Sequence, residues 1–153
     1  MRKVTFVLML VAFVLSGSVV LASDHDKIKE PNVSYRVKVM RAIGANMGAI
    51  GDIFKHGLPF NDAVAVHASN IESSAKLVAS AFEKNATDKA STALPKIWKD
   101  FAKFKAGSED MVKAASELAA AAGSGNKGQI MGAMKNLGDT CKECHKAFRE
   151  KRK

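Results

Sequence analysis

Apolar residues in this chain recur at steps of three and four along four separate segments, and no segment shows a convincing alternation with a period of two. A step of three or four places side chains on one face of a helix, whereas side chains alternate between faces along a strand. The segments cover about residues 34–54, 61–82, 95–118 and 130–148. The pattern therefore predicts an all-α fold with four helices.

The connections between these segments contain residues that end or begin helices. HGLPFN (56–61) interrupts the first segment, and its Asn61 is placed to cap the second helix. KNATDKASTA (84–93) ends the second helix, Pro95 suits the first turn of the third, and GSGN (123–126) precedes the fourth. Short connections between long helices favour antiparallel neighbours. We therefore expect an antiparallel up-down-up-down four-helix bundle.

The first 22 residues have the pattern of a secretory signal peptide. Arg2 and Lys3 precede an apolar run, and Val20 and Ala22 occupy the −3 and −1 positions of an export cleavage site. An uncleaved anchor is the alternative, because residues 4–22 approach the ~20 residues of a membrane helix, although SGS at 16–18 interrupts them. We expect cleavage before Ser23 and export to a bacterial periplasm.

Residues 23–153 have the usual length of one domain. The full chain has 24 basic and 15 acidic residues, so the loss of Arg2 and Lys3 leaves 22 against 15, a net charge of +7. We expect no nucleic-acid partner for an exported chain, despite this charge. We also expect no stable membrane insertion after cleavage, because no other apolar stretch reaches membrane length.

Both cysteines of the chain lie in the sequence CKECH, as Cys141 and Cys144, and His145 follows directly. A structural zinc ion needs four ligands, and no second Cys/His cluster completes such a set. A C-x-x-C-H sequence is typical of covalent c-type haem attachment, in which the thiols form thioethers and the imidazole binds the iron. A disulfide or a redox-active thiol pair is the alternative, although a pair of the thioredoxin kind normally follows a strand.

The chain resembles the class II cytochromes c, the cytochrome c prime family. The resemblance rests on an exported four-helix chain that ends in C-x-x-C-H-x-x-[FY]-[RK], and on the weaker stretches SYRVKVM (34–40) and LPKIW (94–98). The C-terminal residues of the motif are Cys141, Cys144, His145, Phe148 and Arg149. The resemblance implies one covalent haem c and a four-helix bundle.

Met40 is the candidate for a second axial ligand opposite His145. The end of the fourth helix lies beside the start of the first in such a bundle, and Met40 falls in that layer. Met134 and Met131 share the helix of His145, roughly 16 and 21 Å along its axis, and cannot reach the iron. The resemblance places the ligand methionine of the low-spin branch at Met40, whereas other members keep there a residue that only covers a five-coordinate iron. Core packing is the third interpretation of this side chain.

Two functions follow from the two states of the iron. With His145 and Met40 both bound, the protein is an electron carrier and not an enzyme, and this is the function that we expect. With Met40 unbound, the resemblance to the high-spin branch implies binding of NO or CO. A thiol–disulfide oxidoreductase would instead need both cysteines free of haem. The apolar residues expected around the haem are Val78, Phe82, Ile97, Trp98 and Phe101.

Charged residues suggest further contacts of the haem and of the protein. Arg36 resembles a family position near the haem propionates, and a guanidinium suits a carboxylate. A basic cluster surrounds the haem motif and predicts a redox partner with an acidic docking surface, although cations at a helix C-terminus also stabilise the helix dipole. The cluster comprises Lys142, Lys146, Arg149, Lys151, Arg152 and Lys153. Either a monomer or a homodimer is compatible with the sequence.

Overall fold

The computed structural model describes residues 28–151, and these fold into six helices and no strand. The predicted signal peptide, its cleavage site before Ser23, and Arg152 and Lys153 lie outside the described residues. The helices are α1 (Pro31–His56), α2 (Ala63–Ala75), α3 (Val78–Ala81), α4 (Lys96–Lys99), α5 (Phe101–Gly123) and α6 (Lys127–Phe148). No helix within residues 28–151 is both long enough and apolar enough to cross a membrane.

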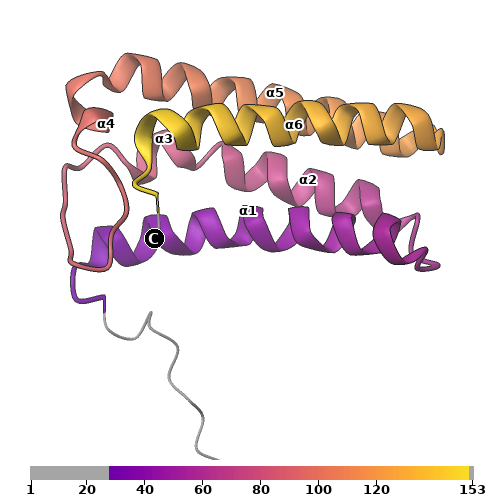
Figure 1. Cartoon of the computed structure of the whole chain (residues 1–153), viewed down its shortest axis with the longest axis horizontal. Helices are drawn as coiled ribbons and strands as arrows, with labels where there is room; N and C mark the ends of the chain where they lie inside the picture. Colours follow the sequence, from indigo (N-terminus) through magenta and orange to yellow (C-terminus); the bar gives the residue numbers. More distant parts are fainter. Residues whose placement is uncertain (1–27, 152–153) are drawn as a thin grey trace, which may run out of the picture.

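The helices form an antiparallel four-helix bundle, as the sequence predicts. α1 runs from the end of the bundle where α3 and α4 lie to the opposite end, α2 returns, α5 runs out again and α6 brings the chain back (Figure 1). The two short helices α3 and α4 extend α2 and precede α5 at the end where α1 begins (Figure 1). The start of α1 and the end of α6 therefore share one end of the bundle, as the haem interpretation requires.

The ends of α1 and α6 are set by local signals. α1 begins at Pro31, three residues before the predicted start, and the Glu30 carboxylate caps it by accepting the Asn32 N–H at 3.1 Å. Gly57 ends it in the left-handed conformation at φ 62°, which glycine adopts without steric strain. Asn126 caps α6 by accepting the Gln129 N–H at 3.1 Å.

The second and third predicted helices are each interrupted. The second ends at Ala75 and resumes at Val78, and its N-cap is Asp62. The prediction that Asn61 caps it is wrong, because Asp62 occupies the N-cap position, without a side-chain capping bond, and Asn61 lies in the turn before it, where its carbonyl accepts the Val64 N–H. The third breaks at Asp100, whose φ of −137° and ψ of 57° separate α4 from α5.

The core is centred on α2, which packs against both α1 and α5, while α5 packs against α6. α1 and α6 have no comparably extensive contact within the described residues. The helices thus enclose a full apolar core on the α2 side and leave space between α1 and α6. The most buried core residues include Ile50, Val64, Ala68, Ile71, Ala115, Leu118 and Leu137.

Candidate haem site

A cavity of about 490 Å³ lies at the end of the bundle where α1 begins and α6 ends. Its walls come from α1, from Val78 and Phe82 after α2, from the segment 91–93, and from α4, α5 and α6. This volume is within the range of small-molecule and cofactor sites. The cavity occupies the space that the sparse contact between α1 and α6 leaves open.

The α6 wall of the cavity holds the three residues of the predicted haem motif. Cys141, Cys144 and His145 all line the cavity and are half-buried. They share one face because residues three and four positions apart are neighbours on a helix. Both cysteines are free thiols. The structure therefore brings the two thiols and the imidazole together beside one cofactor-sized space.

The electrostatics of the two thiols do not suit a redox pair. Burial raises the pKa of the Cys141 thiol, and burial together with the neighbouring Cys141 raises the pKa of the Cys144 thiol. The thiolate is the reactive form of cysteine, and redox-active pairs have lowered pKa values. This environment opposes thiol–disulfide exchange.

His145 is held in its neutral form. Burial lowers its pKa first, and the nearby charge of Arg149 lowers it further. The Arg149 N–H donates to the His145 carbonyl at 3.0 Å, which fixes Arg149 one turn after the histidine. A neutral imidazole has the lone pair that an iron ligand needs.

The α1 wall of the cavity is mainly apolar. Val37, Met40, Gly44 and Met47 line it at steps of three and four. Met40 thus faces the cavity, in the layer where the sequence placed it. Met47 and Met111 also line the cavity, although counted in helical turns both lie deeper in the bundle than Met40. The cavity is deeper than one layer of the bundle, and a helix position counted in turns does not reveal that depth.

Arg36 lies in the wall with 2% of its surface exposed. Its Nη2 donates to the Ala86 carbonyl at 2.8 Å and to the Ser91 hydroxyl at 2.9 Å, and its guanidinium lies 5.1 Å from the Phe82 ring and 5.2 Å from the Trp98 ring. Its buried Nη1 has no hydrogen-bond acceptor within residues 28–151. Desolvation lowers the pKa of Arg36, and the charge of Glu30 partly opposes that effect.

A buried donor without a partner fits the haem hypothesis. Buried polar groups in native proteins are nearly always hydrogen-bonded, and a guanidinium fork suits a carboxylate such as a haem propionate. The two thiols, the neutral imidazole and this free donor are the groups that a covalent haem c would engage. The residues present therefore fit this cofactor.

Part of the predicted apolar surroundings of the haem lines the cavity. Val78, Phe82 and Ile97 do so, whereas Trp98 and Phe101 do not. The Trp98 indole N–H donates to the Phe82 carbonyl at 2.8 Å, so Trp98 joins α4 to the residue that follows α3.

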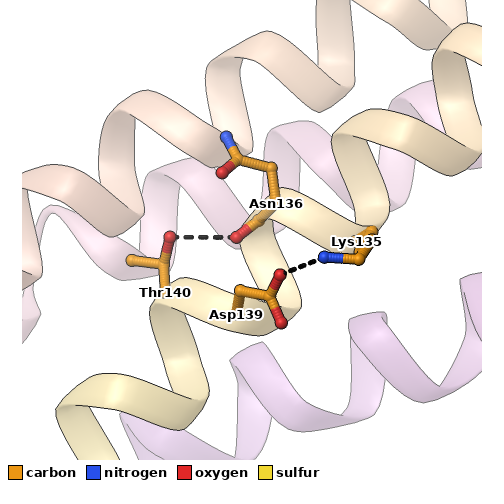
Figure 2. A network of polar contacts seen from close by, with 4 residues as sticks. All are labelled: Lys135, Asn136, Asp139 and Thr140. Carbon is orange, nitrogen blue, oxygen red and sulfur yellow. Dashed lines mark hydrogen bonds and ion pairs between the residues drawn. The ribbon is translucent and has the colours of Figure 1, made fainter.

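Residues 91–93, Ser108 and Thr140 line the cavity although the sequence pattern did not predict it. The Ser108 hydroxyl donates to the Lys105 carbonyl at 2.7 Å, and the Thr140 hydroxyl to the Asn136 carbonyl at 3.0 Å (Figure 2). Both hydroxyl protons are therefore used within their own helices. Their spacing from other lining residues on α5 and α6 is the signal that would have found these two, whereas the fold alone places segment 91–93.

The segment 92–94 is fastened to the end of α6. The Leu94 N–H donates to the Phe148 carbonyl at 3.0 Å, and the Glu150 N–H to the Thr92 carbonyl at 2.8 Å. Around this end, Lys142, Lys146, Arg149 and Lys151 are exposed, so the described part of the basic cluster faces solvent.

Comparison with known proteins identifies relatives over nearly all the described residues. The sequence model of the family described as Cytochrome C' matches residues 31–149. A cytochrome c' of Rhodospirillum rubrum is 41% identical over 118 residues, covering 76% of this chain and 80% of the relative. A cytochrome c' of Pararhodospirillum photometricum is 37% identical over 122 residues, covering 79% and 98%.

Solved structures agree with these sequence matches. Cytochrome c prime from Shewanella frigidimarina superposes with a TM-score of 0.73 at 31% identity, covering 80% of this chain and 98% of that one. A nitric oxide complex of a mutant cytochrome c prime from Alcaligenes xylosoxidans has a TM-score of 0.69 at 27% identity, covering 78% and 94%.

These relatives correct the predicted function. The expectation was an electron carrier of the low-spin branch, with His145 and Met40 both bound to the iron. The relatives are cytochromes c', and the nitric oxide complex demonstrates that one of them binds a diatomic gas. They contradict the electron-carrier prediction and favour its alternative, the binding of NO or CO. The prediction was wrong because it assigned Met40, a methionine facing the haem layer, as a ligand. A side chain in that layer need only cover the iron.

Proposed function

Because the chain belongs to the cytochrome c' family, whose members bind a covalent c-type haem, we propose that it binds NO and CO at a five-coordinate haem iron. Cys141 and Cys144 hold the haem through thioether bonds, and His145 is the axial ligand from the protein. A ferrous haem iron with one open axial position supplies the chemistry of gas binding. The observation that carries the proposal is the mainly apolar α1 wall of a cavity whose α6 wall holds all three attachment residues.

The cavity chemistry favours neutral diatomic ligands. Distal polarity and hydrogen-bond donors determine what a haem binds and activates. The Ser108 and Thr140 hydroxyls already donate to backbone carbonyls, and Val37, Met40 and Met47 present apolar or thioether groups. NO and CO need no hydrogen-bond donor to bind ferrous iron. Such a site disfavours the stabilisation of a charged ligand.

Met40 and Arg36 have supporting roles in this proposal. Met40 covers the open side of the iron without binding it and so sets the room for a ligand. Arg36 donates its free Nη1 to a haem propionate, while the Ala86 carbonyl and the Ser91 hydroxyl hold its Nη2. The buried guanidinium then gains an acceptor for Nη1, which has none within residues 28–151.

The cellular context belongs to the same proposal. Residues 1–22 act as a signal peptide, and residues 23–153 form a single haem domain that works in the periplasm as a monomer or homodimer. The named relatives come from bacteria, which is compatible with this location. CO binds only ferrous haem iron, so a reducing partner would have to supply the electron for that state. The exposed Lys142, Lys146 and Lys151 offer a surface for a partner with acidic residues.

Absorption spectra of the purified holoprotein test the proposed function. We expect high-spin bands in both oxidation states and a shift when CO is added to the reduced protein. Met40→Ala should stay high-spin and bind CO faster, because a covering side chain is removed. Met131→Ala is the matched control, since Met131 is 44% exposed and does not line the cavity. A low-spin wild type that ignores CO and becomes high-spin in Met40→Ala would overturn the proposal.

A further inference from the structure

The α1 wall of the cavity has a gap at Gly44. Met40, Gly44 and Met47 lie four and three residues apart and all line the cavity, so position 44 falls on the stripe between the two methionines. A Cβ built at Gly44 would meet nothing within 4 Å, and the residue is exposed. At this position the wall therefore consists of bare backbone, with no side chain between the cavity and solvent.

The surroundings of this gap keep it open. Arg41, one turn before Gly44, lines the cavity and is exposed, and Thr140 and Cys141 belong to the wall across from α1. α1 and α6 lack extensive contact, so no packed interface closes the space between them. Deeper in the bundle, a Cβ built at Gly51 would lie 3.8 Å from the Met134 Cε. The Met134 side chain therefore covers α1 at that depth, whereas no described residue covers it at Gly44.

The gap also lies on the side that a ligand must reach. The three attachment residues belong to α6, so a haem held by them would have the α1 wall of the cavity on the side opposite His145. A small molecule that passes Gly44 enters between Met40 and Met47, on that side. No side chain at position 44 stands in its path.

We propose that the opening beside Gly44 is the entry route for neutral diatomic ligands, and that the absence of a side chain at this position sets their rate of access. The inference rests on the proposed gas-binding function. A gate of this kind changes association and dissociation together, because both directions use the same passage, whereas the equilibrium affinity stays close to its original value.

Gly44→Leu tests the route, with Gly44→Ala as a milder variant and Gly48→Leu as the matched control. Gly48 lies one turn further along α1, is exposed and has nothing within 4 Å of a built Cβ, but it does not line the cavity. Both leucine substitutions replace an exposed helical glycine with the same side chain. Their effects on helix formation are therefore alike, and only their relation to the cavity differs.

The measurement is CO rebinding to the ferrous holoproteins after flash photolysis, together with the CO dissociation rate. We expect Gly44→Leu to slow both rates by about tenfold. Gly44→Ala should slow them less, and Gly48→Leu should behave like the wild type. Equal rates in the wild type, Gly44→Leu and Gly48→Leu would overturn the route, as would equal slowing in both leucine variants. A wild type that takes up no CO would instead overturn the proposed function, and the route with it.

Discussion

Two faces of α1 differ in how the chain fills the space beside them. On the core side, where it packs against α2, the helix buries Val39, Ile50 and Ile53, and Ile50 is 0% exposed. Its cavity side presents Val37, Met40, Gly44 and Met47, of which none is fully buried, while the buried Ile43 lies at the boundary and also lines the cavity. The two faces alternate along the same helix. The difference indicates that the protein completes its own core on one side and leaves the other to a covalent group.

The difference explains why flexible and small residues occur on the cavity side. β-branched residues have few rotamers and pack well against fixed neighbours, as Val39, Ile43 and Ile50 do. Methionine adapts to irregular surfaces, and glycine leaves space for other atoms. The core side requires a fixed shape, whereas the cavity side must accept the cofactor and its ligand.

Replacement of both attachment cysteines should have the largest effect, because it would remove the haem from the cavity. We expect the double substitution Cys141→Ser and Cys144→Ser to lose covalent haem entirely, because serine cannot form the thioether bonds. Mass spectrometry of protein matured in a haem-attaching host measures this directly. Thr140→Ala, which alters the same wall but no thiol, should keep one haem per chain. A haem that remained covalently bound to the double variant would contradict the assignment.

Truncation of one side chain on each face sharpens the comparison. Ile50→Ala should lower the free energy of unfolding by about 2–5 kcal/mol, the usual range for a fully buried aliphatic residue. Met47→Ala should lower it by less than about 2 kcal/mol, since the half-buried side chain leaves space that is already present. Urea unfolding of both holoproteins gives the two values. Equal losses would mean that the two faces are packed alike.

Arg36 lines the cavity and also bonds to the segment after α3. Its replacement should therefore lower both the stability of the fold and the contribution of the haem to that stability. Arg36→Leu leaves the buried Ala86 carbonyl without its donor, so we expect a loss of about 1–3 kcal/mol in unfolding free energy. If Nη1 also binds a propionate, the loss is larger in holoprotein than in haem-free protein. Ser91→Ala is the control, since it removes one acceptor and keeps the charge. An identical loss with and without haem would exclude the propionate contact.

The smallest expected effect is a pH dependence at Asp88. The pKa of this carboxyl is lowered first by the Ala90 N–H and then by the N–H groups of Glu30 and Lys29, which fasten residues 88–90 to the start of α1. Because the pKa of Asp88 is lower in the folded protein, its hydrogen bonds stabilise the fold fully at pH values above the unfolded-state pKa of about 3.9. This stabilisation is lost as the pH falls through the pKa of the folded protein.

The variant Asp88→Asn isolates this effect. Thermal unfolding between about pH 3 and 6 should be less steeply dependent on pH in Asp88→Asn than in the wild type, because the variant cannot titrate at this position. Glu30 contributes in the same direction, since its pKa is also lowered, mainly by Asn32. Parallel pH profiles for the two proteins would show that the Asp88 contacts add nothing to stability.

The sequence predicts most reliably what depends on local spacing. The helical repeat predicts the four long helices, and the positions of Cys141, Cys144 and His145 on one helix face follow from the same repeat. The interruptions at Lys76 and at Asp100 were not predicted, because the apolar stripe continues through both and only the packing around them decides the break.

The sequence prediction also did not distinguish the core face of α1 from its cavity face. The predicted helix over 34–54 was treated as having one apolar face, but Ile50 packs in the core, Met40 and Met47 line the cavity, and Ile43 does both. A single repeat of three and four cannot separate two adjacent faces of one helix. What packs against each face determines its role, and the cavity face packs against the haem, which the helical repeat does not reveal.

The two hydrogen bonds that join residues 92–94 to residues 148–150 have a consequence for the order of assembly. They connect segments that lie far apart in the sequence and meet only after α5 and α6 have packed, so they close late in folding and fray early on heating. Opening them frees Thr92 and Ala93 without unwinding a helix. We therefore expect these two hydrogen bonds to open while the helices that hold the two thiols stay folded.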